Sequence, residues 1–419
     1  MAGRAMARAL LRAMRGLTGL VLCGTMLAAC STNGPGDIAG AAPLAAPFPS
    51  LSEPPPADKT RPVKVALLVP LSAHGSAGII GKSLKQAAEL ALFERDNPSL
   101  QLMVKDDKGT PEGAKAAAEE AIRGGAALIL GPLFAKSAAA VAPAARQAGV
   151  SVVSFSNDGT VAGNGVYLLS FQPAPEVARA VAYAAQRGKR RFVALIPDDA
   201  FGKLASASFT EAVSRAGGTV VALETYPASA NGALEPMRKI STVIQASEEA
   251  GAPIDALFLP GGQENLQIIA RLLPQAEIDT EKVKLIGTGG MDYPNAGGDA
   301  KLIGAWYPAP DPRGWLDFSQ KYAKSYGSAP PRIATVAYDA VNLAIALSGG
   351  PYSAAQLTRA SGFTGVDGAY RLKPDGGTDR ALAILEVQKF SAGIVDNAPG
   401  LAPAGPPATS ALPPLLNLN

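Results

Sequence analysis

Short apolar runs alternate with longer amphipathic stretches along most of this chain. The run Val65 to Val69 lies between Pro62 and Pro70 and is rich in β-branched residues. It is too short for an independent helix, so it predicts a buried parallel strand. A small polar loop and a helical pattern from about 78 to 97 follow it. This order begins a doubly wound α/β lobe, in which ligands bind at the loops beyond the carboxyl ends of the strands.

The same pattern occurs a second time. KVALLVP at 64–70 is matched by RFVALIP at 191–197, ALILGP at 127–132 by ALFLPG at 256–261, and VSVVSFSND at 150–158 by VKLIGTGG at 283–290. A single match would mean little, because buried strands resemble one another. Three matches in the same order and at nearly the same spacing predict two lobes built on one plan. The length of 419 residues also favours two domains over one.

The first residues have the features of a targeting segment. Arg4, Arg8, Arg12 and Arg15 form a basic region, Leu17 to Met26 is apolar, and Leu27-Ala28-Ala29-Cys30 follows. This is the lipobox pattern of bacterial lipoproteins, in which the cysteine is acylated and becomes the first residue. We therefore expect a signal peptide at 1–29 and lipidation at Cys30. Ser31, in place of aspartate, favours the outer membrane over the inner membrane.

Composition changes the picture of the mature chain. Of the two cysteines, Cys23 leaves with the signal peptide and Cys30 is lipidated, so no disulfide is expected. Removing the four arginines of the leader from the 38 basic residues leaves 34, against 35 acidic ones. The net charge is then −1, which gives no reason to expect a nucleic-acid partner. Segments 30–62 and 397–419 are rich in proline and alanine and predict a flexible tether and a disordered tail.

Several stretches together resemble the type I periplasmic solute-binding proteins, in particular the branched-chain amino-acid-binding (leucine-binding-protein-like) group. They are KVALLVPLSAHGSAGIIGKSLKQAAELAL, TPEGAKAAAEEAIRGGAALILGP, RQAGVSVVSFSND, RRFVALIPDDAFGK, ATVAYDAVNLAIAL and GFTGVDGAYRLKPDGGTDRALAILEV, and they cover about residues 63 to 390 in order. Within this group, the SFSND and GPLF stretches and the lipobox look most like the lipoproteins named penicillin-binding protein activators.

The resemblance implies an α/β fold of two doubly wound Rossmann-like lobes joined by three crossovers. Lobe one would hold 63–172 and 306–366, and lobe two 174–304 and 370–392. Late strands are expected at 366–372 and 381–387, as a hairpin around 374–377. The ligand would bind in the cleft, to residues on the loops that face it. The candidates are Ser72, His74, Ser76, Phe134, Ser137, Ser156, Asn157, Asp158, Asp199, Phe201, Gln263 and Asp292.

The family pattern also suggests what the ligand is not. Amino-acid binders of this family hold the α-carboxylate with Ser and Thr groups, yet Asp158 stands where a Thr is expected. The acidic partner of the α-ammonium is replaced by Gly289 or Gly290, although Asp292 is near. We therefore expect a free amino acid to bind weakly.

Other chemistry finds little support in the sequence. GSAGIIGKS at 75–83 nearly matches a phosphate-binding P-loop, but its first glycine is one position too early. His74 is the only histidine, so the chain can build no zinc cluster of histidines and cysteines. It can build no histidine-based triad other than one that uses His74. We expect no enzyme activity, no cofactor and no metal.

Two functions remain. In the first, the chain is a periplasmic lipoprotein that activates a penicillin-binding protein and so regulates peptidoglycan synthesis. In the second, it is the solute receptor of an ABC importer for an amino acid or a related small polar ligand, with the permease as its partner. In both cases the lipid anchor is the only expected contact with the membrane.

Overall fold

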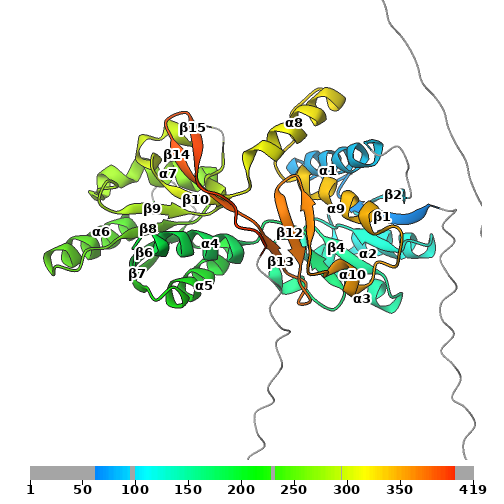
Figure 1. The fold of residues 1–419 in the computed structure, drawn as a ribbon, viewed down its shortest axis with the longest axis horizontal. Coiled ribbons are helices and arrows are strands. Elements are labelled where there is room, and N and C mark those ends of the chain that lie inside the picture. The colour runs from blue at the N-terminus through cyan, green and yellow to red at the C-terminus, as the bar shows by residue number, and fades with distance from the viewer. Residues whose placement is uncertain (1–61, 95–99, 228–231, 294, 402–419) are drawn as a thin grey trace, which may run out of the picture. The chain divides into compact units, whose positions relative to one another are not determined.

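The computed structural model describes residues 62–94, 100–227, 232–293 and 295–401. The expected signal peptide, Cys30, the tether up to residue 61 and most of the expected tail lie outside these residues. Residues from Ala57 onward belong to one compact unit. This unit contains two lobes of mostly parallel sheet (Figure 1).

Lobe one is built on a parallel sheet with the strand order β2-β1-β3-β4-β5. Its strands are β1 (Val63–Val69), β2 (Leu100–Asp106), β3 (Leu128–Leu130), β4 (Ser151–Ser154) and β5 (Val166–Leu168). Successive side chains of β1 enter different cores: Val65, Leu67 and Val69 pack on one face and Ala66 and Leu68 on the other. A strand buried on both faces needs the unbroken apolar run that the sequence shows.

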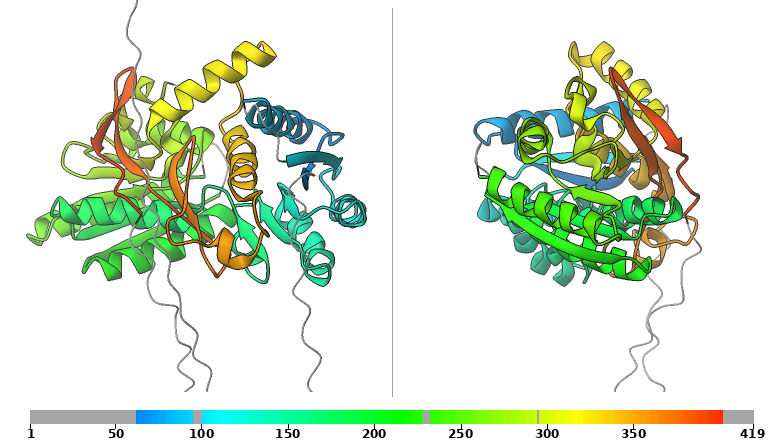
Figure 2. Two further views of the ribbon diagram at one scale, coloured as in Figure 1. Left: turned by 45° about the vertical axis from the view of Figure 1, so that its right-hand side comes forward. Right: turned by 90° about the vertical axis from the view of Figure 1, so that its left-hand side faces the viewer.

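Helices cover both faces of this sheet (Figure 2). They are α1 (Ser76–Phe93), α2 (Pro111–Arg123), α3 (Ala135–Gln147), α8 (Pro312–Tyr326), α9 (Ala334–Leu347) and the short α10 (Ala354–Leu357). Alanines of α2 and α3 contact one face, and α1 and α9 cover the other. A small antiparallel sheet of β11 (Phe363–Gly365), β12 (Gly368–Leu372) and β13 (Thr378–Arg380) completes the lobe.

Lobe two repeats the plan. Its sheet has the order β15-β14-β10-β9-β8-β6-β7, with strands β6 (Arg191–Pro197), β7 (Thr219–Tyr226), β8 (Ala256–Leu259), β9 (Lys284–Gly287), β10 (Trp306–Ala309), β14 (Ala383–Gln388) and β15 (Ser391–Asp396). Helices α4 (Pro173–Gln186) and α5 (Ala200–Arg215) cover one face, and α6 (Leu234–Glu249) and α7 (Gln263–Leu272) cover the other. The order β7-β6-β8-β9-β10 reproduces that of lobe one, so the repeat read from the sequence corresponds to equivalent strands.

Short 3₁₀ turns occupy several loops. They are η1 (Gly159–Val161), η2 (Leu273–Ala276), η3 (Gly289–Met291), η4 (Ala296–Gly298) and η5 (Ala300–Leu302). Of these, η3 follows β9 and helps to form the site described below.

The chain passes between the lobes three times, at 169–172, 310–311 and 381–382. The expected fold class is confirmed, but two expected boundaries differ from the structure. Trp306–Ala309 is a strand of the lobe-two sheet, because it pairs with β9 and β14, so lobe one resumes only after it. The expected hairpin closes on 378–380, which pairs with β12, so lobe two resumes at β14 and not at 370.

Candidate functional site

A pocket of about 370 Å³ lies between the lobes, at the loops that follow the parallel strands. This volume is within the range of pockets that hold small molecules. Its wall consists of Asn157, Phe171, Glu176, Phe201, Gly261, Gly262, Gly289, Gly290, Asp292, Pro308, Ala309, Pro310 and Arg332. Both lobes and the crossing segments contribute, so a molecule bound here contacts each lobe. We call it the interlobe pocket.

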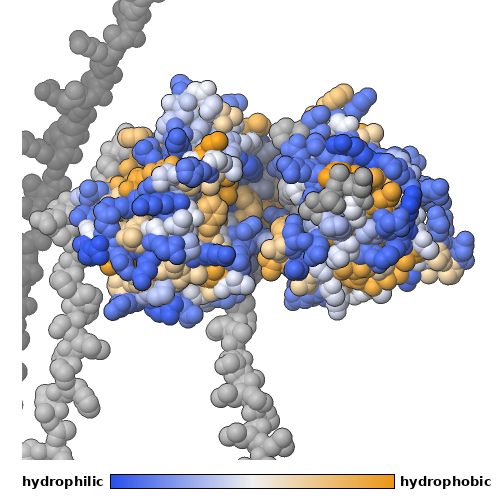
Figure 3. All heavy atoms as spheres, turned by 180° about the vertical axis from the view of Figure 1, so that it is seen from behind, coloured by the Kyte–Doolittle hydropathy of each residue, from blue (hydrophilic) through white to orange (hydrophobic). Residues whose placement is uncertain are grey.

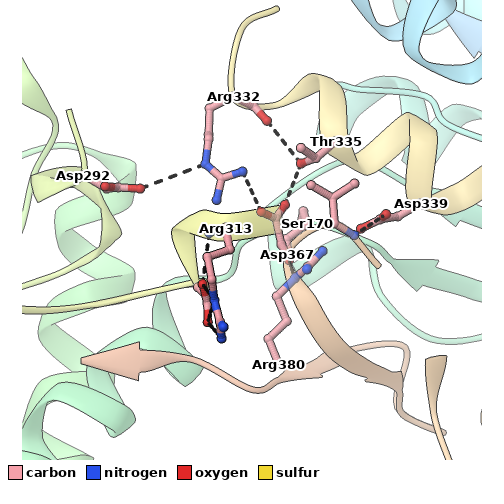
Figure 4. Close-up of polar contacts among 10 residues, drawn as sticks. Ser170, Asp292, Arg313, Arg332, Thr335, Asp339, Asp367 and Arg380 are labelled. Atoms are coloured by element: carbon pink, nitrogen blue, oxygen red, sulfur yellow. Dashed lines mark hydrogen bonds and ion pairs between the residues drawn. The ribbon is translucent and has the colours of Figure 1, made fainter. Parts of the chain in front are cut away.

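Arg332 is the basic residue in the wall of the interlobe pocket, and it pairs with a buried carboxylate (Figure 4). Its Nη1 lies 2.5 Å from Oδ1 of Asp367, a side chain with no exposed surface. The other carboxylate oxygen of Asp367 accepts a hydrogen bond of 2.6 Å from the hydroxyl of Thr335. A buried carboxylate is retained only when it is well paired. Asp367 is therefore the buried partner of the guanidinium, and Arg332 is part of the pocket wall.

Aromatic rings lie beside the charged groups. The guanidinium of Arg332 lies 5.8 Å from the ring centre of Phe171, and that of Arg380 lies 4.6 Å from the same ring. Phe171 belongs to the first crossing segment, whereas Phe201 lies in the first turn of α5. Cations favour the faces of aromatic rings. The two rings give the pocket an apolar wall next to its cation.

Glu176 brings a carboxylate to the wall of the same pocket. It lies in the first turn of α4, is 8% exposed, and its Oε2 accepts a hydrogen bond of 2.9 Å from the backbone N–H of Gly289. Burial raises the pKa of Glu176 to about 7, and this hydrogen bond and the charge of Arg380 oppose the rise. A Cβ at Gly289 would lie 3.1 Å from Oε1 of Glu176. Glycine at this turn thus makes room for the carboxylate.

Asp292 is a second carboxylate of the pocket, and 39% of its side chain is exposed. Its Oδ2 lies 4.0 Å from Nε of Arg332, and its Oδ1 accepts a hydrogen bond of 3.4 Å from the hydroxyl of Tyr307. Loss of hydration raises the pKa of Asp292, opposed by Arg332 and Tyr307. Both contacts are long, so this carboxylate is not firmly bound. The pocket therefore holds one guanidinium and two incompletely paired carboxylates.

The structure places three of the expected binding residues, Asn157, Phe201 and Asp292, in the wall of the interlobe pocket. Their part in binding remains a prediction. Five others lie outside this wall, on exposed loops or helix starts: Ser72, His74, Ser76, Asp199 and Gln263. Of these, Asp199 caps α5, because its side chain accepts a hydrogen bond of 2.7 Å from the N–H of Gly202.

The remaining four candidates lie on loops and at a helix start of lobe one. Phe134 precedes α3, and the hydroxyl of Ser137 is buried without a hydrogen-bond partner among the described residues. Ser156 accepts a hydrogen bond of 3.1 Å from the N–H of Asp158. The carboxylate of Asp158 in turn accepts bonds of 2.9 and 2.7 Å from the N–H and hydroxyl of Thr160. None of these four candidates belongs to the wall of the interlobe pocket.

Two features of the structure bear on the argument against amino acids, and weak binding of a free amino acid stays a prediction. Asp158 is turned into its own loop, where it caps η1, and does not bring its charge to the pocket. Lobe two does supply carboxylates, from Glu176 and Asp292. Gly289 makes room for the carboxylate of Glu176, an acidic residue that comes from another element.

Sequence reasoning missed Glu176, Arg332 and Phe171. Glu176 follows two prolines at the start of α4, and Arg332 follows two prolines before α9. Acidic residues are common in first helical turns, and isolated arginines are common on surfaces, so neither signal is specific. These three residues, from a crossing segment, the start of α4 and the segment before α9, come together only in the folded protein.

The glycines of the P-loop-like stretch have a structural role. A Cβ at Gly78 would lie 2.1 Å from the carbonyl oxygen of Ala73, and one at Gly81 would lie 2.5 Å from that of Pro70. They let the first turns of α1 approach the end of β1 closely.

Within the described ranges, no group of three or more His, Cys, Asp or Glu residues is placed to hold a metal ion. Among the same residues, no helix is both long and apolar enough to span a bilayer.

Comparison with known proteins gives a consistent result. Residues 62–393 match the model of the family described as periplasmic binding protein. A putative branched-chain amino acid ABC transporter protein from Rhodospirillum rubrum is 18% identical, with a TM-score of 0.69 over 80% of this chain and all of the other. An ABC transporter substrate-binding protein from Desulfitobacterium hafniense, in complex with leucine, is 18% identical, with a TM-score of 0.60 over 80% of this chain and all of the other.

A third solved structure binds a different ligand. It is a solute-binding protein of Rhodopseudomonas palustris BisB5 in complex with 3,4-dihydroxybenzoic acid, 21% identical, with a TM-score of 0.55 over 81% of this chain and 99% of the other. At these identities the likeness concerns the fold. Among curated proteins, the uncharacterized protein RP748 of Rickettsia prowazekii is 21% identical over 233 residues, which are 55% of this chain and 61% of that relative.

Proposed function

We propose that this chain, which belongs to the periplasmic binding protein family, is a non-enzymatic receptor for a small zwitterionic ligand in its interlobe pocket. The ligand class is an amino acid with an apolar side chain, or a close analogue. The observation that carries the proposal is the presence of Arg332 beside Glu176 and Asp292 in one pocket of about 370 Å³. A carboxylate of the ligand pairs with Arg332, and its ammonium group with the two acidic residues.

The electrostatics favour a zwitterion over a simple anion or cation. Glu176 and Asp292 both have raised pKa values because burial disfavours their charged forms. An ammonium group between them favours the charged forms again, so binding and deprotonation reinforce each other. A ligand with only a carboxylate pairs with Arg332 but gives these two groups no partner. The rings of Phe171 and Phe201 receive the apolar part of the ligand.

Titration calorimetry on the unit from Ala57 to Asn419 tests this proposal. The twenty amino acids are the ligands, and two analogues of leucine serve as matched controls: 4-methylpentanoate, which lacks the ammonium group, and isopentylamine, which lacks the carboxylate. We expect at least one apolar amino acid to bind with a Kd below 100 µM. Each analogue of the ligand that lacks one charged group binds at least 10-fold more weakly, since each lost charged hydrogen bond is worth about 1.5 kcal/mol or more.

Two results would refute it. If no amino acid binds below 1 mM, the pocket does not serve this class of ligand. If the deaminated acid binds as tightly as the amino acid, the acidic residues of the pocket do not take part. In the second case the ligand is a simple organic acid.

The partner that follows from this proposal is the permease of an ABC importer, because the structural neighbours are substrate-binding proteins of such transporters. A deletion strain should then lose uptake of the ligand that calorimetry identifies. Uptake that is unchanged in this strain would contradict the importer role while leaving ligand binding intact.

A second candidate function, activation of a penicillin-binding protein, is favoured by a different observation. The stretches that carry the resemblance to the activators form the frame of lobe one: Ser154 donates a hydrogen bond of 3.0 Å to the carbonyl of Pro132 and accepts one of 3.2 Å from the N–H of Ser156. The two stretches are thus tied to each other, and Asn157 is the residue of the SFSND stretch that lines the interlobe pocket. A purified penicillin-binding protein, assayed for glycan polymerisation with and without this protein, tests the role. An unchanged rate at saturating protein would exclude direct activation of that enzyme.

The proposed location is the periplasm, with a lipid anchor at Cys30 in the outer membrane. Support comes from the lipobox and from Ser31. Mass spectrometry of the native protein should show an acylated N-terminal cysteine, and membrane fractionation should place it with outer-membrane markers. An unmodified N-terminus at another residue would refute the anchor.

A further inference from the structure

A second hollow lies beside the interlobe pocket. It has a volume of about 440 Å³ and shares two wall residues, Asp292 and Arg332, with the interlobe pocket. Aromatic rings and prolines dominate the rest of its wall: Tyr293, Tyr307, Trp315, Phe390, Pro312 and Pro330. We call it the aromatic groove. The β14–β15 hairpin, the turns after β9 and the start of α8 form it.

The rim of the aromatic groove is strongly exposed. Phe390, at the turn of the β14–β15 hairpin, is 81% exposed, and Ile303 is 42% exposed. Ile303 is close to this hairpin, because the N–H of Gly304 donates a hydrogen bond of 2.8 Å to the carbonyl of Val387. The face shown in Figure 3 carries hydrophilic residues together with apolar clusters on both lobes. Exposed apolar side chains around a groove are typical of an interaction site.

The walls fit one kind of partner. Grooves lined with aromatic rings bind proline-rich segments in the polyproline II conformation, which loses little entropy on binding. Within this chain, residues 397–419 contain six prolines and no charged side chain, and Leu412-Pro413-Pro414-Leu415-Leu416 is their most apolar part. This composition gives the segment no core of its own. Burial of its leucines is favourable, and the segment places no charged side chain near Asp292 and Arg332.

We propose that the aromatic groove binds the segment Leu412–Leu416 of the same chain. The reach is sufficient. Ser391 lines the groove and Leu401 is the last described residue, so the ten residues between them span at most about 34 Å. The eleven residues from Leu401 to Leu412 cover about 34 Å as polyproline II, and more when fully extended. Leu412 can therefore reach the groove even when Leu401 lies at this greatest distance from Ser391.

The shared residues give this contact a consequence. The ring of Trp315 lies 4.7 Å from the guanidinium of Arg332, which also faces the interlobe pocket. A ligand that draws Arg332 toward its carboxylate changes one wall of the groove. Binding of the tail and binding of the ligand are then coupled, and the coupling is reciprocal. The tail contact itself does not depend on the identity of the ligand.

A labelled peptide tests the tail contact directly. The peptide is Gly405–Asn419 with a fluorophore, and the proteins are the unit ending at Leu401 and the unit ending at Asn419. Fluorescence anisotropy should show one-to-one binding to the shorter protein. Binding to the longer protein should be at least 10-fold weaker, since its own tail competes at a high effective concentration.

Matched variants locate the contact. Phe390→Ala in the shorter protein should weaken peptide binding at least 10-fold. Phe93→Ala is the control, because Phe93 on α1 is 77% exposed and lies outside the groove. A peptide with Pro413→Ala and Pro414→Ala should also bind more weakly. The shared folding of the variants is checked by circular dichroism.

Four results would overturn the proposal. The first is the absence of saturable peptide binding to the shorter protein up to 1 mM, and the second is equal peptide affinity of the two proteins. The third is an equal loss of peptide affinity in Phe390→Ala and Phe93→Ala. The fourth is a dimer of the longer protein that dissociates when the tail is removed. The last result would mean that the tail binds a second copy.

Discussion

Replacing Glu176 by glutamine tests the energetics of the interlobe pocket. Glu176 is 8% exposed, and its Oε2 accepts a hydrogen bond of 2.9 Å from the N–H of Gly289. Glutamine has nearly the same shape and retains an oxygen that accepts this bond. The substitution therefore removes the ionisation of the side chain and leaves the packing of the α4 start in place.

The magnitude follows from the pKa. Burial raises the pKa of Glu176 from 4.5 to about 7, so the folded state binds a proton that the unfolded state has already lost between these values. Stability therefore falls as the pH rises through this window, because the native state binds more protons than the unfolded state. At about 1.4 kcal/mol per pH unit the full loss is about 3 kcal/mol, and it is complete above pH 7. Between pH 5 and pH 8 it amounts to about 2 to 3 kcal/mol.

Urea unfolding of the unit from Ala57 to Asn419 at pH 5, 6, 7 and 8 measures this effect. The free energy of unfolding of Glu176→Gln, relative to the unchanged protein, should rise by about 2 to 3 kcal/mol across the series. Asp107 and Asp339, whose pKa values burial raises to about 6 and about 7, titrate in both proteins, so their contributions cancel. Glu264→Gln is the control, because Glu264 is also an acidic residue in a first helical turn but is exposed.

A constant difference between the two proteins from pH 5 to pH 8 would refute the reasoning, since Glu176 would then titrate alike in the folded and unfolded states. The same pH dependence in Glu264→Gln would also refute it. In the pocket, Glu176→Gln should weaken binding of the zwitterionic ligand about 10-fold at pH 8, because the ammonium group loses a charged partner.

Three further predictions concern the same region. Gly290→Ala should lower the free energy of unfolding by about 1 to 3 kcal/mol, because its Cβ would lie 2.0 Å from a backbone carbonyl, whereas Gly159→Ala, with open space around the Cβ, should have little effect in the same denaturation assay. Arg332→Lys should keep the charge near its buried partner but weaken binding of the ligand carboxylate about 10-fold or more by calorimetry, because an ammonium cannot form the paired bonds of a guanidinium. Asp158→Asn should leave ligand affinity within about twofold, since the side chain caps its own loop and lies outside the pocket wall; a larger change would return this residue to the site.

Much of the fold could be predicted because buried parallel strands have a strong local signature. The apolar run at 65–69 and its repeat at 193–196 are strands whose two faces both enter hydrophobic cores. The late boundaries were harder. Trp306–Ala309 looks like the start of a new segment, but its pairing with β9 and β14 assigns it to lobe two. Pairing between strands distant in the sequence leaves no local trace in either of them.

The candidate site shows the same division. The sequence alone determined that loops after the strands face a cleft, and it placed Asn157, Phe201 and Asp292 on such loops, because local order decides where a strand ends. It did not determine which side chains enter the pocket. Asp158 has the chemistry of a binding residue but bonds to its own turn, and Ser156 bonds to Asp158.

The charge of the pocket depends on the tertiary structure. Glu176 comes from the start of α4 and Arg332 from the segment before α9, and each is held by a group from yet another element, the N–H of Gly289 and the carboxylate of Asp367. The physical reason is burial. A carboxylate or guanidinium is costly inside a protein unless a partner lies within bonding distance, and that partner is supplied by the fold and not by the neighbouring residues of the chain.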